Sequence, residues 1–385
     1  MVAYLSRNTW ILFVALAGLS WGTYVPLIAY GGSELGGKAE ARLLAILCVG
    51  IAYFLIGVLY PLYYLLRLPQ SAQPEFTATG LGFSALAGAA GAAGAICVVF
   101  ATAAAPEYKM FIAPLIFGLA PVINTLVSMI WHPKKGQPLH FGLQAPHWLL
   151  WVGIVCVALG AAIVLYSKEL SEAGDKATPS ILLALEQGFS TSKPWLLFTL
   201  LAGLAWGTYV PLIFYGGSEL GGKPSSRLLA ILCVGLAYFI MAVLGPSLLL
   251  LRSEQQPAWD SLTGLTFSGL AGAAGAIGAI CVIFATKSAI DSAKAEGRPP
   301  ATYKLFIAPL IFGLAPVINT LVSVLWHPLK GNPLSFALKT PHPLLWLGIV
   351  AVGLGAALVL YSKELGETAP LTKPTPSPEP EPKPA

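Results

Sequence analysis

Several polar and aromatic residues lie inside apolar segments, where they could bind a ligand. The sequence Trp-Gly-Thr-Tyr occurs at residues 21–24 and again at residues 206–209. An indole ring can stack on the C–H face of a ligand, and the hydroxyls of threonine and tyrosine can bond its oxygen atoms. These residue types therefore suit a neutral polyhydroxylated ligand. The candidate substrate-binding residues are Trp21, Thr23, Tyr24, Trp206, Thr208, Tyr209, Asn124 and Asn319.

The same tryptophans could instead form part of an aromatic belt at a membrane surface. Trp21 lies about midway along its apolar run, which favours the binding site over the belt. Other tryptophans lie near the ends of apolar runs and fit the belt well: Trp10, Trp131, Trp148 and Trp195.

Prolines within the apolar runs could interrupt helices. Pro114 and Pro121 are seven residues apart and so lie on one helical face, and each removes a backbone donor. A carbonyl freed in this way needs a partner in lipid, so a broken span normally faces protein or a wet cavity. Asn124 follows Pro121 closely, which predicts polar groups near mid-membrane, although a kinked packing helix is an equally good interpretation. The predicted helix breaks are at Pro26, Pro114, Pro121, Pro211, Pro309 and Pro316.

Charged residues follow the first apolar run of each half and could gate a substrate path. The candidate gate residues are Glu34, Arg42, Glu219 and Arg227. Their spacing also allows ordinary surface ion pairs on a helix end. The GGSELGGK segment (residues 31–38 and 216–223), which contains Glu34 and Glu219, lacks the ending of a phosphate-binding loop and is predicted to be a flexible hinge.

The sequence argues against enzymatic chemistry. No apolar run contains Asp or Glu, whereas a proton-coupled carrier usually keeps an ionisable relay in the membrane. That favours facilitated diffusion, or coupling to sodium rather than to protons. The histidines have no acidic neighbours, so no metal site is expected, and no nucleophile or acid–base pair suggests an enzyme or a cofactor. The five cysteines all lie in apolar runs, which argues against a disulfide framework.

The chain is predicted to be a polytopic helical membrane protein. Its 385 residues are 56% hydrophobic and only 10% charged. Ten apolar runs reach the length that spans ~30 Å of hydrocarbon. They cover residues 10–30, 43–66, 77–104, 110–131, 148–166, 195–215, 228–251, 262–286, 305–326 and 344–361.

An internal duplication organises these runs. Residues 108–133 and 303–328 are identical at 23 of 26 positions, and the whole of 10–170 aligns with 195–365. One copy holds five spans, an odd number, so the second copy must enter the membrane upside down. Inverted repeats of this kind are typical of secondary transporters, with the substrate site near the midplane between the repeats. The predicted units are a first repeat (1–170), a linker (171–194), a second repeat (195–365) and a disordered Pro-rich tail (366–385).

Charge predicts the orientation. Loops on the amino-terminal side, with the tail, carry 13 Lys and Arg residues, against 9 in the opposite loops. The positive-inside rule therefore places both termini in the cytoplasm, in a cytoplasmic (inner) or plasma membrane. The net charge of +5 forms no basic cluster, so the expected partners are a small molecule and the lipid bilayer, not nucleic acid.

Ten spans in two inverted halves, with the WGTYVPL element in the first span of each and a fourth span rich in Gly and Pro, resemble the drug/metabolite transporter superfamily. The chain is most similar to its glucose and rhamnose permease-like branch. The resemblance covers residues 10–365 and implies an alternating-access cavity lined by the first and fourth spans, with a sugar as substrate. The missing membrane carboxylates depart from what a proton symporter needs.

Two other functions stay open at this point. The chain could export drugs or amphipathic metabolites with the same fold. It could also be a membrane scaffold or sensor that transports nothing.

Overall fold

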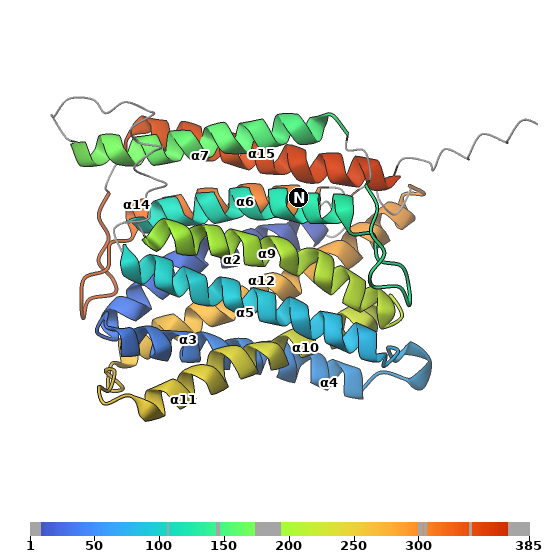
Figure 1. The fold of residues 1–385 in the computed structure, drawn as a ribbon, viewed down its shortest axis with the longest axis horizontal. Coiled ribbons are helices and arrows are strands. Elements are labelled where there is room, and N and C mark those ends of the chain that lie inside the picture. The colour runs from blue at the N-terminus through green and yellow to red at the C-terminus, as the bar shows by residue number, and fades with distance from the viewer. Residues whose placement is uncertain are drawn as a thin grey trace, which may run out of the picture.

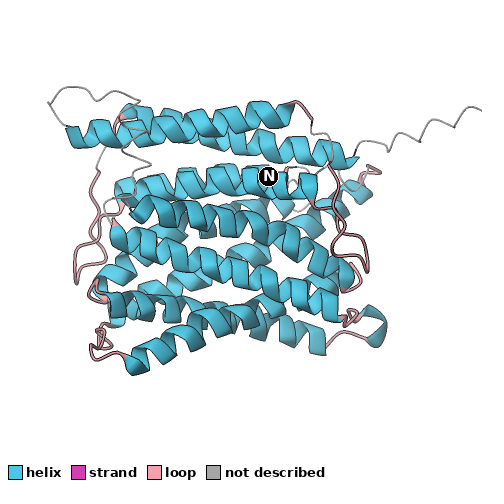
Figure 2. Ribbon diagram, viewed as in Figure 1, coloured by secondary structure: helices cyan, strands magenta, loops and turns pink. Residues whose placement is uncertain are grey.

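The computed structural model describes residues 9–105, 108–143, 147–173, 194–298, 303, 306–338 and 341–368. Within these residues the protein is all-α, with isolated β-bridges in two loops as the only extended pairing (Figure 2). The linker 171–194 and the tail 366–385 fall almost wholly outside the described residues.

The described helices follow the order of the two sequence copies. The first copy contains α2 (Thr9–Glu34), α3 (Ala39–Phe54), η1 (Leu55–Leu59), α4 (Tyr60–Leu66), the short η2 (Gln70–Ala72), α5 (Ala78–Ala104), α6 (Lys109–Ile130) and α7 (Leu149–Ala173). The second contains α9 (Pro194–Glu219), α10 (Pro224–Tyr238), η4 (Phe239–Leu244), α11 (Gly245–Arg252), α12 (Leu262–Ala295), α14 (Ile307–Leu325) and α15 (Pro343–Thr368).

Among the residues that the structure describes, nine helical segments are long and apolar enough to cross a membrane, counting α3–η1–α4 and α10–η4–α11 as one segment each. The remaining predicted span, residues 305–326, forms a shorter apolar helix in the described residues, Leu310–Leu325 within α14. Large apolar side chains such as Leu12, Leu159 and Leu354 are exposed on the outside of the bundle, as expected of a lipid-facing surface. The chain is therefore an integral membrane protein.

Small residues set the distance between helices. A Cβ atom at Gly88 of α5 would overlap the backbone of Val234 in α10, and one at Gly272 of α12 would overlap that of Val49 in α3. Close approach through small residues is how helices pack where lipid offers no hydrophobic driving force. The small residues along α5 and α12 therefore form packing surfaces.

Each copy packs its first span against the other copy (Figure 1). Helix α2 lies on α12 and α14, and α9 lies on α5 and α6. Helices α7 and α15 pair with each other in an outer layer, where Gly153 approaches the carbonyl of Gly355 and Gly160 that of Gly348. The loop after α6 and the loop after α14 lie at opposite ends of the bundle (Figure 1).

The predicted helix breaks are wrong for the first and fourth spans. Helix α2 continues through Pro26, α9 through Pro211, and α14 through Pro316. Pro309 lies in the first turn of α14, where it interrupts no preceding helix. Helix α6 likewise continues through Pro114 and Pro121. A proline removes only one helical donor, and contacts with several neighbouring helices hold these spans in one piece.

The departure from α-helical geometry lies instead in the second span of each copy. Segments η1 and η4 are π-helical, and Pro61 and Pro246 follow them at the start of α4 and α11. These prolines cannot donate to the preceding turn, and the wider π turn accommodates their rings. Single π turns inside helices occur frequently at functional sites.

An insert distinguishes the second copy. The sequence places it at residues 287–302, and its described part extends α12 to 34 residues, against 27 in α5. The extra turns end at Ala295. Within them, the Ser288 hydroxyl forms a hydrogen bond with the hydroxyl of Thr9, the first residue of α2.

Candidate functional site

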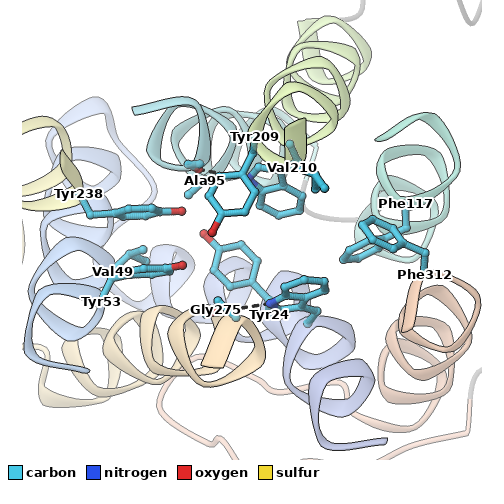
Figure 3. Close-up of a pocket in the computed structure, with 14 residues that line it drawn as sticks. Tyr24, Val49, Tyr53, Ala95, Phe117, Tyr209, Val210, Tyr238, Gly275 and Phe312 are labelled. Atoms are coloured by element: carbon cyan, nitrogen blue, oxygen red, sulfur yellow. Dashed lines mark hydrogen bonds between the residues drawn. The ribbon is translucent and has the colours of Figure 1, made fainter. Parts of the chain in front are cut away.

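A cavity lies between the two copies, lined by α2, α3, α5, α6, α9, α10, α12 and α14 (Figure 3). We call it the central cavity. Its volume is about 90 Å³ for the centre of a water-sized sphere, which is room for several waters. Its lining residues are Trp21, Tyr24, Val49, Tyr53, Gly91, Ala95, Phe117, Trp206, Tyr209, Val210, Tyr238, Gly275, Ala279 and Phe312.

Both copies contribute equally to this lining. Twelve of the fourteen residues form pairs that are equivalent in the duplicated sequence: Trp21 with Trp206, Tyr24 with Tyr209, Tyr53 with Tyr238, Gly91 with Gly275, Ala95 with Ala279, and Phe117 with Phe312. Neither copy has a complete site of its own. The cavity exists only because the two copies face each other.

The two tryptophans are fixed on the glycine-rich spans. Trp21 Nε1 donates a hydrogen bond to the Gly275 carbonyl at 3.2 Å, and Trp206 Nε1 donates to the Gly91 carbonyl at 3.1 Å. A Cβ atom at Gly278 would overlap the Trp21 indole, and one at Gly94 would overlap that of Trp206. The glycines therefore seat the indoles, whose N–H groups are already used.

Four tyrosines form one wall of the cavity. The rings of Tyr53 and Tyr238 are stacked, with centroids 3.8 Å apart and planes 3° from parallel. Tyr24 crosses to the other copy and meets the Trp206 ring edge-on, with centroids 6.0 Å apart. Figure 3 shows the four hydroxyls directed toward the middle of the cavity. The Tyr24 hydroxyl is buried and has no hydrogen-bond partner within the described part of the chain.

The opposite wall is purely apolar. Phe117 and Phe312 meet there edge-on, with centroids 6.0 Å apart (Figure 3). Eight of the fourteen lining residues are aromatic and, among the described residues, none that lines the cavity is charged. The cavity therefore has a hydroxyl-bearing side and an apolar side, and it offers an ionic ligand no counter-charge.

Comparisons with known proteins add little to this geometry. No protein-family model and no curated protein matches the chain. A solved structure described only as "Crystal structure of protein" is 16% identical, and the match covers 92% of this chain and 97% of that one at a TM-score of 0.44. A similarity at that level assigns neither a family nor a function to the chain.

The structure brings together four of the eight predicted binding residues. Trp21, Tyr24, Trp206 and Tyr209 line the central cavity. The other four do not line it. The Thr23 hydroxyl donates to the Leu19 and Ser20 carbonyls of its own helix, and Thr208 does the same to Leu204 and Ala205. Asn124 and Asn319 are buried within α6 and α14, and their roles stay predictions.

Sequence reasoning missed Tyr53, Tyr238, Phe117 and Phe312. The two phenylalanines sit in strongly apolar stretches, where nothing separates a cavity residue from a packing residue. The tyrosines did carry a signal, because each is a polar aromatic residue in the middle of a second span, at equivalent positions in both copies. The prolines of the first and fourth spans favoured those spans instead.

Two short hairpins close over the ends of the first spans. Hairpin 131–141 has antiparallel bridges between Trp131 and Phe141 and between Lys134 and Gln137, and hairpin 326–336 has the equivalent pair. Each turns at a glycine with positive φ, 76° at Gly136 and 75° at Gly331. This is a conformation that glycine adopts at little cost.

The candidate gate carboxylates hold these hairpins. Glu219 Oε1 accepts a hydrogen bond from the Gly136 N–H at 2.7 Å, and Glu34 Oε1 accepts one from Gly331 at 2.8 Å. Both glutamates are buried, although each lies at a helix end. The Tyr215 hydroxyl also donates to the Lys134 carbonyl at 3.4 Å. Each first span is therefore tied to a hairpin of the other copy.

Aromatic rings fill the space beneath each hairpin. Phe83, Trp131 and Tyr215 contact one another at one end, with centroid distances between 4.8 and 5.7 Å. Their equivalents at the other end are Phe267, Trp326 and Tyr30. The closures are thus an apolar plug capped by a carboxylate–amide hydrogen bond.

The alternative of ion pairs among the candidate gate residues is not what the structure shows. Within the described residues no ion pair joins Glu34 to Arg42 or Glu219 to Arg227. The Arg42 guanidinium lies over the Phe100 ring, 5.7 Å from its centroid. In the GGSELGGK segment, Gly31 and Gly32 continue α2, and Gly36 and Gly37 form a turn with φ of 106° and 69°. The flexibility of this turn stays a prediction. The buried carboxylates of Glu219 and Glu34 instead accept hydrogen bonds from the backbone N–H groups of Gly136 and Gly331.

Proposed function

We propose that this chain is a transporter of a small neutral polar metabolite, with a sugar as the expected class, and that it works by alternating access between two inverted repeats. The observation that carries the proposal is the central cavity, built in equal parts by the two copies and set between two closures at opposite ends of the bundle. A site between two halves with a closure toward each face is what alternating access requires.

The loops support the inverted arrangement of the repeats. Equivalent hairpins, 131–141 and 326–336, lie at opposite ends of the bundle (Figure 1). Equivalent first spans pack against equivalent third spans across the copies, α2 on α12 and α9 on α5. Charge on the loops further favours cytoplasmic termini in an inner or plasma membrane.

Topology can be tested directly with cysteine labelling. Gly36 and Gly221 are equivalent in sequence and are expected to face opposite sides of the membrane. Single cysteines there, in a cysteine-free background, are expected to react with an impermeant maleimide from opposite sides. Reaction of both from the same side contradicts the inverted arrangement.

The cavity lining supports a neutral ligand. A charged molecule would lose its hydration without gaining a counter-charge from the described lining residues. Aromatic rings and tyrosine hydroxyls suit a ligand with C–H faces and oxygen atoms. At about 90 Å³ the cavity is smaller than the ~300–1,000 Å³ of typical ligand sites, so we expect it to widen when it binds substrate.

The closures suggest how the transport cycle runs. Breaking the Glu34–Gly331 or the Glu219–Gly136 contact would free one hairpin and expose the cavity to one face. Because the cavity lining offers no carboxylate, transport by facilitated diffusion or with sodium fits it better than proton coupling.

The deciding experiment uses the full chain in liposomes. Counterflow of a labelled sugar, tested over a panel of hexoses and pentoses with and without proton and sodium gradients, supports the proposal. Absence of counterflow over the whole panel rejects sugar transport.

A second candidate is an exporter of amphipathic compounds, favoured by the apolar wall of Phe117 and Phe312. Efflux of a lipophilic dye from the same liposomes, without sugar counterflow, would select it. A chain that moves neither would be a membrane scaffold or sensor.

A further inference from the structure

The tyrosine wall of the central cavity carries an inference about selectivity that rests on the proposed transport function. We infer that Tyr24, Tyr53, Tyr209 and Tyr238 select ligands that present two or more hydroxyls along one edge and an apolar surface along the other. The hydroxyls of these four residues, not their ring faces, make the selection.

The first support is the Tyr24 hydroxyl. Tyr24 is 4% exposed, and its oxygen has no partner within the described residues. A buried hydroxyl without a partner is unfavourable, so nearly all such groups in proteins are hydrogen-bonded to something. Since this oxygen points into the cavity (Figure 3), a ligand hydroxyl can satisfy it.

The second support is the stack of Tyr53 on Tyr238. With centroids 3.8 Å apart, each ring covers a face of the other, so those faces cannot also stack on a ligand. What this pair offers the cavity is two hydroxyls side by side (Figure 3). A hydroxyl both donates and accepts, so two of them match two neighbouring hydroxyls of a ligand.

The third support is the exclusion of other donors. The indole N–H groups of Trp21 and Trp206 already bond the carbonyls of Gly275 and Gly91. Among the lining residues, tyrosine hydroxyls are then the only side-chain groups left that can hydrogen-bond a ligand. They lie opposite Phe117 and Phe312, so the ligand must be oriented with its polar edge toward the tyrosines (Figure 3).

The geometry argues against an aromatic cage for a cation. A cation binds over ring faces, within about 6 Å of the centroids. Two of the four tyrosines have faces covered by each other, and all four direct their hydroxyls inward. Substitution of tyrosine by phenylalanine separates the two possibilities, since it removes the hydroxyl and keeps the ring.

The test combines Tyr24→Phe, Tyr53→Phe and Tyr238→Phe with ligands that lack single hydroxyls. Tyr63→Phe is the matched control, because Tyr63 is exposed and lies outside the cavity. For each variant, tryptophan fluorescence measures binding and counterflow measures transport, using the hexose that exchanges fastest and each of its monodeoxy analogues. Elution as a single species and an unchanged unfolding temperature establish that a variant is folded.

We expect each cavity substitution to weaken hexose binding about five- to tenfold, the effect of one hydrogen bond. For at least one monodeoxy analogue the same substitution should have no effect, because the partner hydroxyl is already gone. Equal weakening for every analogue, or no weakening at all, overturns the inference.

Failure of the transport function gives a different result. If no sugar exchanges, the proposed function fails, and the fluorescence measurement still decides the inference. Binding of cis-1,2-cyclohexanediol, which has two adjacent hydroxyls and an apolar opposite edge, supports the tyrosine wall if Tyr24→Phe weakens it and Tyr63→Phe does not. No binding of this diol to the intact protein overturns the inference.

Discussion

The two closures share a design but differ in how much holds them. At both ends a buried glutamate accepts the N–H of a hairpin glycine above three aromatic rings. The Glu219 end has further polar contacts. Lys135 of its hairpin forms an ion pair with Glu75 at 3.1 Å. The Glu75 N–H donates a hydrogen bond to the Leu220 carbonyl, and the Thr77 hydroxyl donates one to the Glu219 carbonyl. In the described residues of the Glu34 end, Lys330 has no ion pair and Trp259 replaces Glu75.

This difference implies that the two faces do not open with equal ease. A net hydrogen bond contributes about 0.5–1.5 kcal/mol, and an exposed ion pair about 0–1 kcal/mol. Of these contacts only the Lys135–Glu75 ion pair joins the hairpin itself, so the extra stabilisation of closure at the Glu219 end is about 0–1 kcal/mol. The two closures therefore differ in stability although the cavity between them is symmetric. We expect the Glu34 end to open more readily.

The symmetry of the cavity itself is open to the most disruptive test. Gly94→Ala and Gly278→Ala add a Cβ where the Trp206 and Trp21 indoles sit. Overpacking costs about 1–3 kcal/mol and should push each indole into the cavity, which we expect to lower exchange at least about tenfold in both variants. Gly82→Ala, which meets open space, is the control for α5. Unequal losses would show that the two sides of the cavity differ in function.

Removing the carboxylates tests the closures one at a time. A cysteine at Ala279 in a cysteine-free background reports access to the cavity through its rate of labelling from each face. Glu34→Ala removes a hydrogen bond to a charged group, worth about 1.5–3 kcal/mol, and should raise labelling from its own side about tenfold or more. Glu219→Ala should raise labelling from the opposite side less, because its other contacts remain. Equal increases would contradict the asymmetry.

A surface lysine sharpens the comparison further. Lys135 and Glu75 are 65% and 49% exposed, so their ion pair is weak. Lys135→Ala should therefore increase labelling from the Glu219 side by only about two- to fivefold. The equivalent Lys330→Ala should leave labelling from the Glu34 side unchanged. An effect of Lys330→Ala as large as that of Lys135→Ala would place an unrecognised partner at the Glu34 end.

The smallest expected effect concerns protons. Glu34→Gln and Glu219→Gln keep an oxygen that can accept the glycine N–H, so equilibrium exchange should persist in both. An imposed pH gradient should not drive accumulation in the unaltered protein, because the described lining of the cavity has no carboxylate. Uphill uptake under a pH gradient that either substitution abolishes would reveal a proton site.

Much of the membrane architecture could be predicted from the sequence. The length of each apolar run and the duplication of residues 10–170 in 195–365 can both be recognised without knowledge of the packing. Four of the eight candidate residues line the central cavity, because an aromatic residue in the middle of an apolar run is visible in the sequence. Thr23 and Thr208 could not be excluded, since a hydroxyl inside a helix can bond either a ligand or its own backbone, and only packing decides. The hairpin contacts of Glu34 and Glu219 join residues 297 and 83 positions apart, which no local pattern indicates.

The stacked tyrosines lie directly before the π segments, and this placement constrains the length of the second spans. A π turn corresponds to one residue inserted into an α-helix, and one residue corresponds to about 100° of rotation. Deleting one residue between Leu55 and Leu59 would restore regular α geometry while changing the helical phase of everything before it. Tyr53 would then turn away from Tyr238. We therefore expect the second spans to tolerate many substitutions of apolar residues but no deletion of a single residue. Most surface loops, in contrast, tolerate a change in their number of residues.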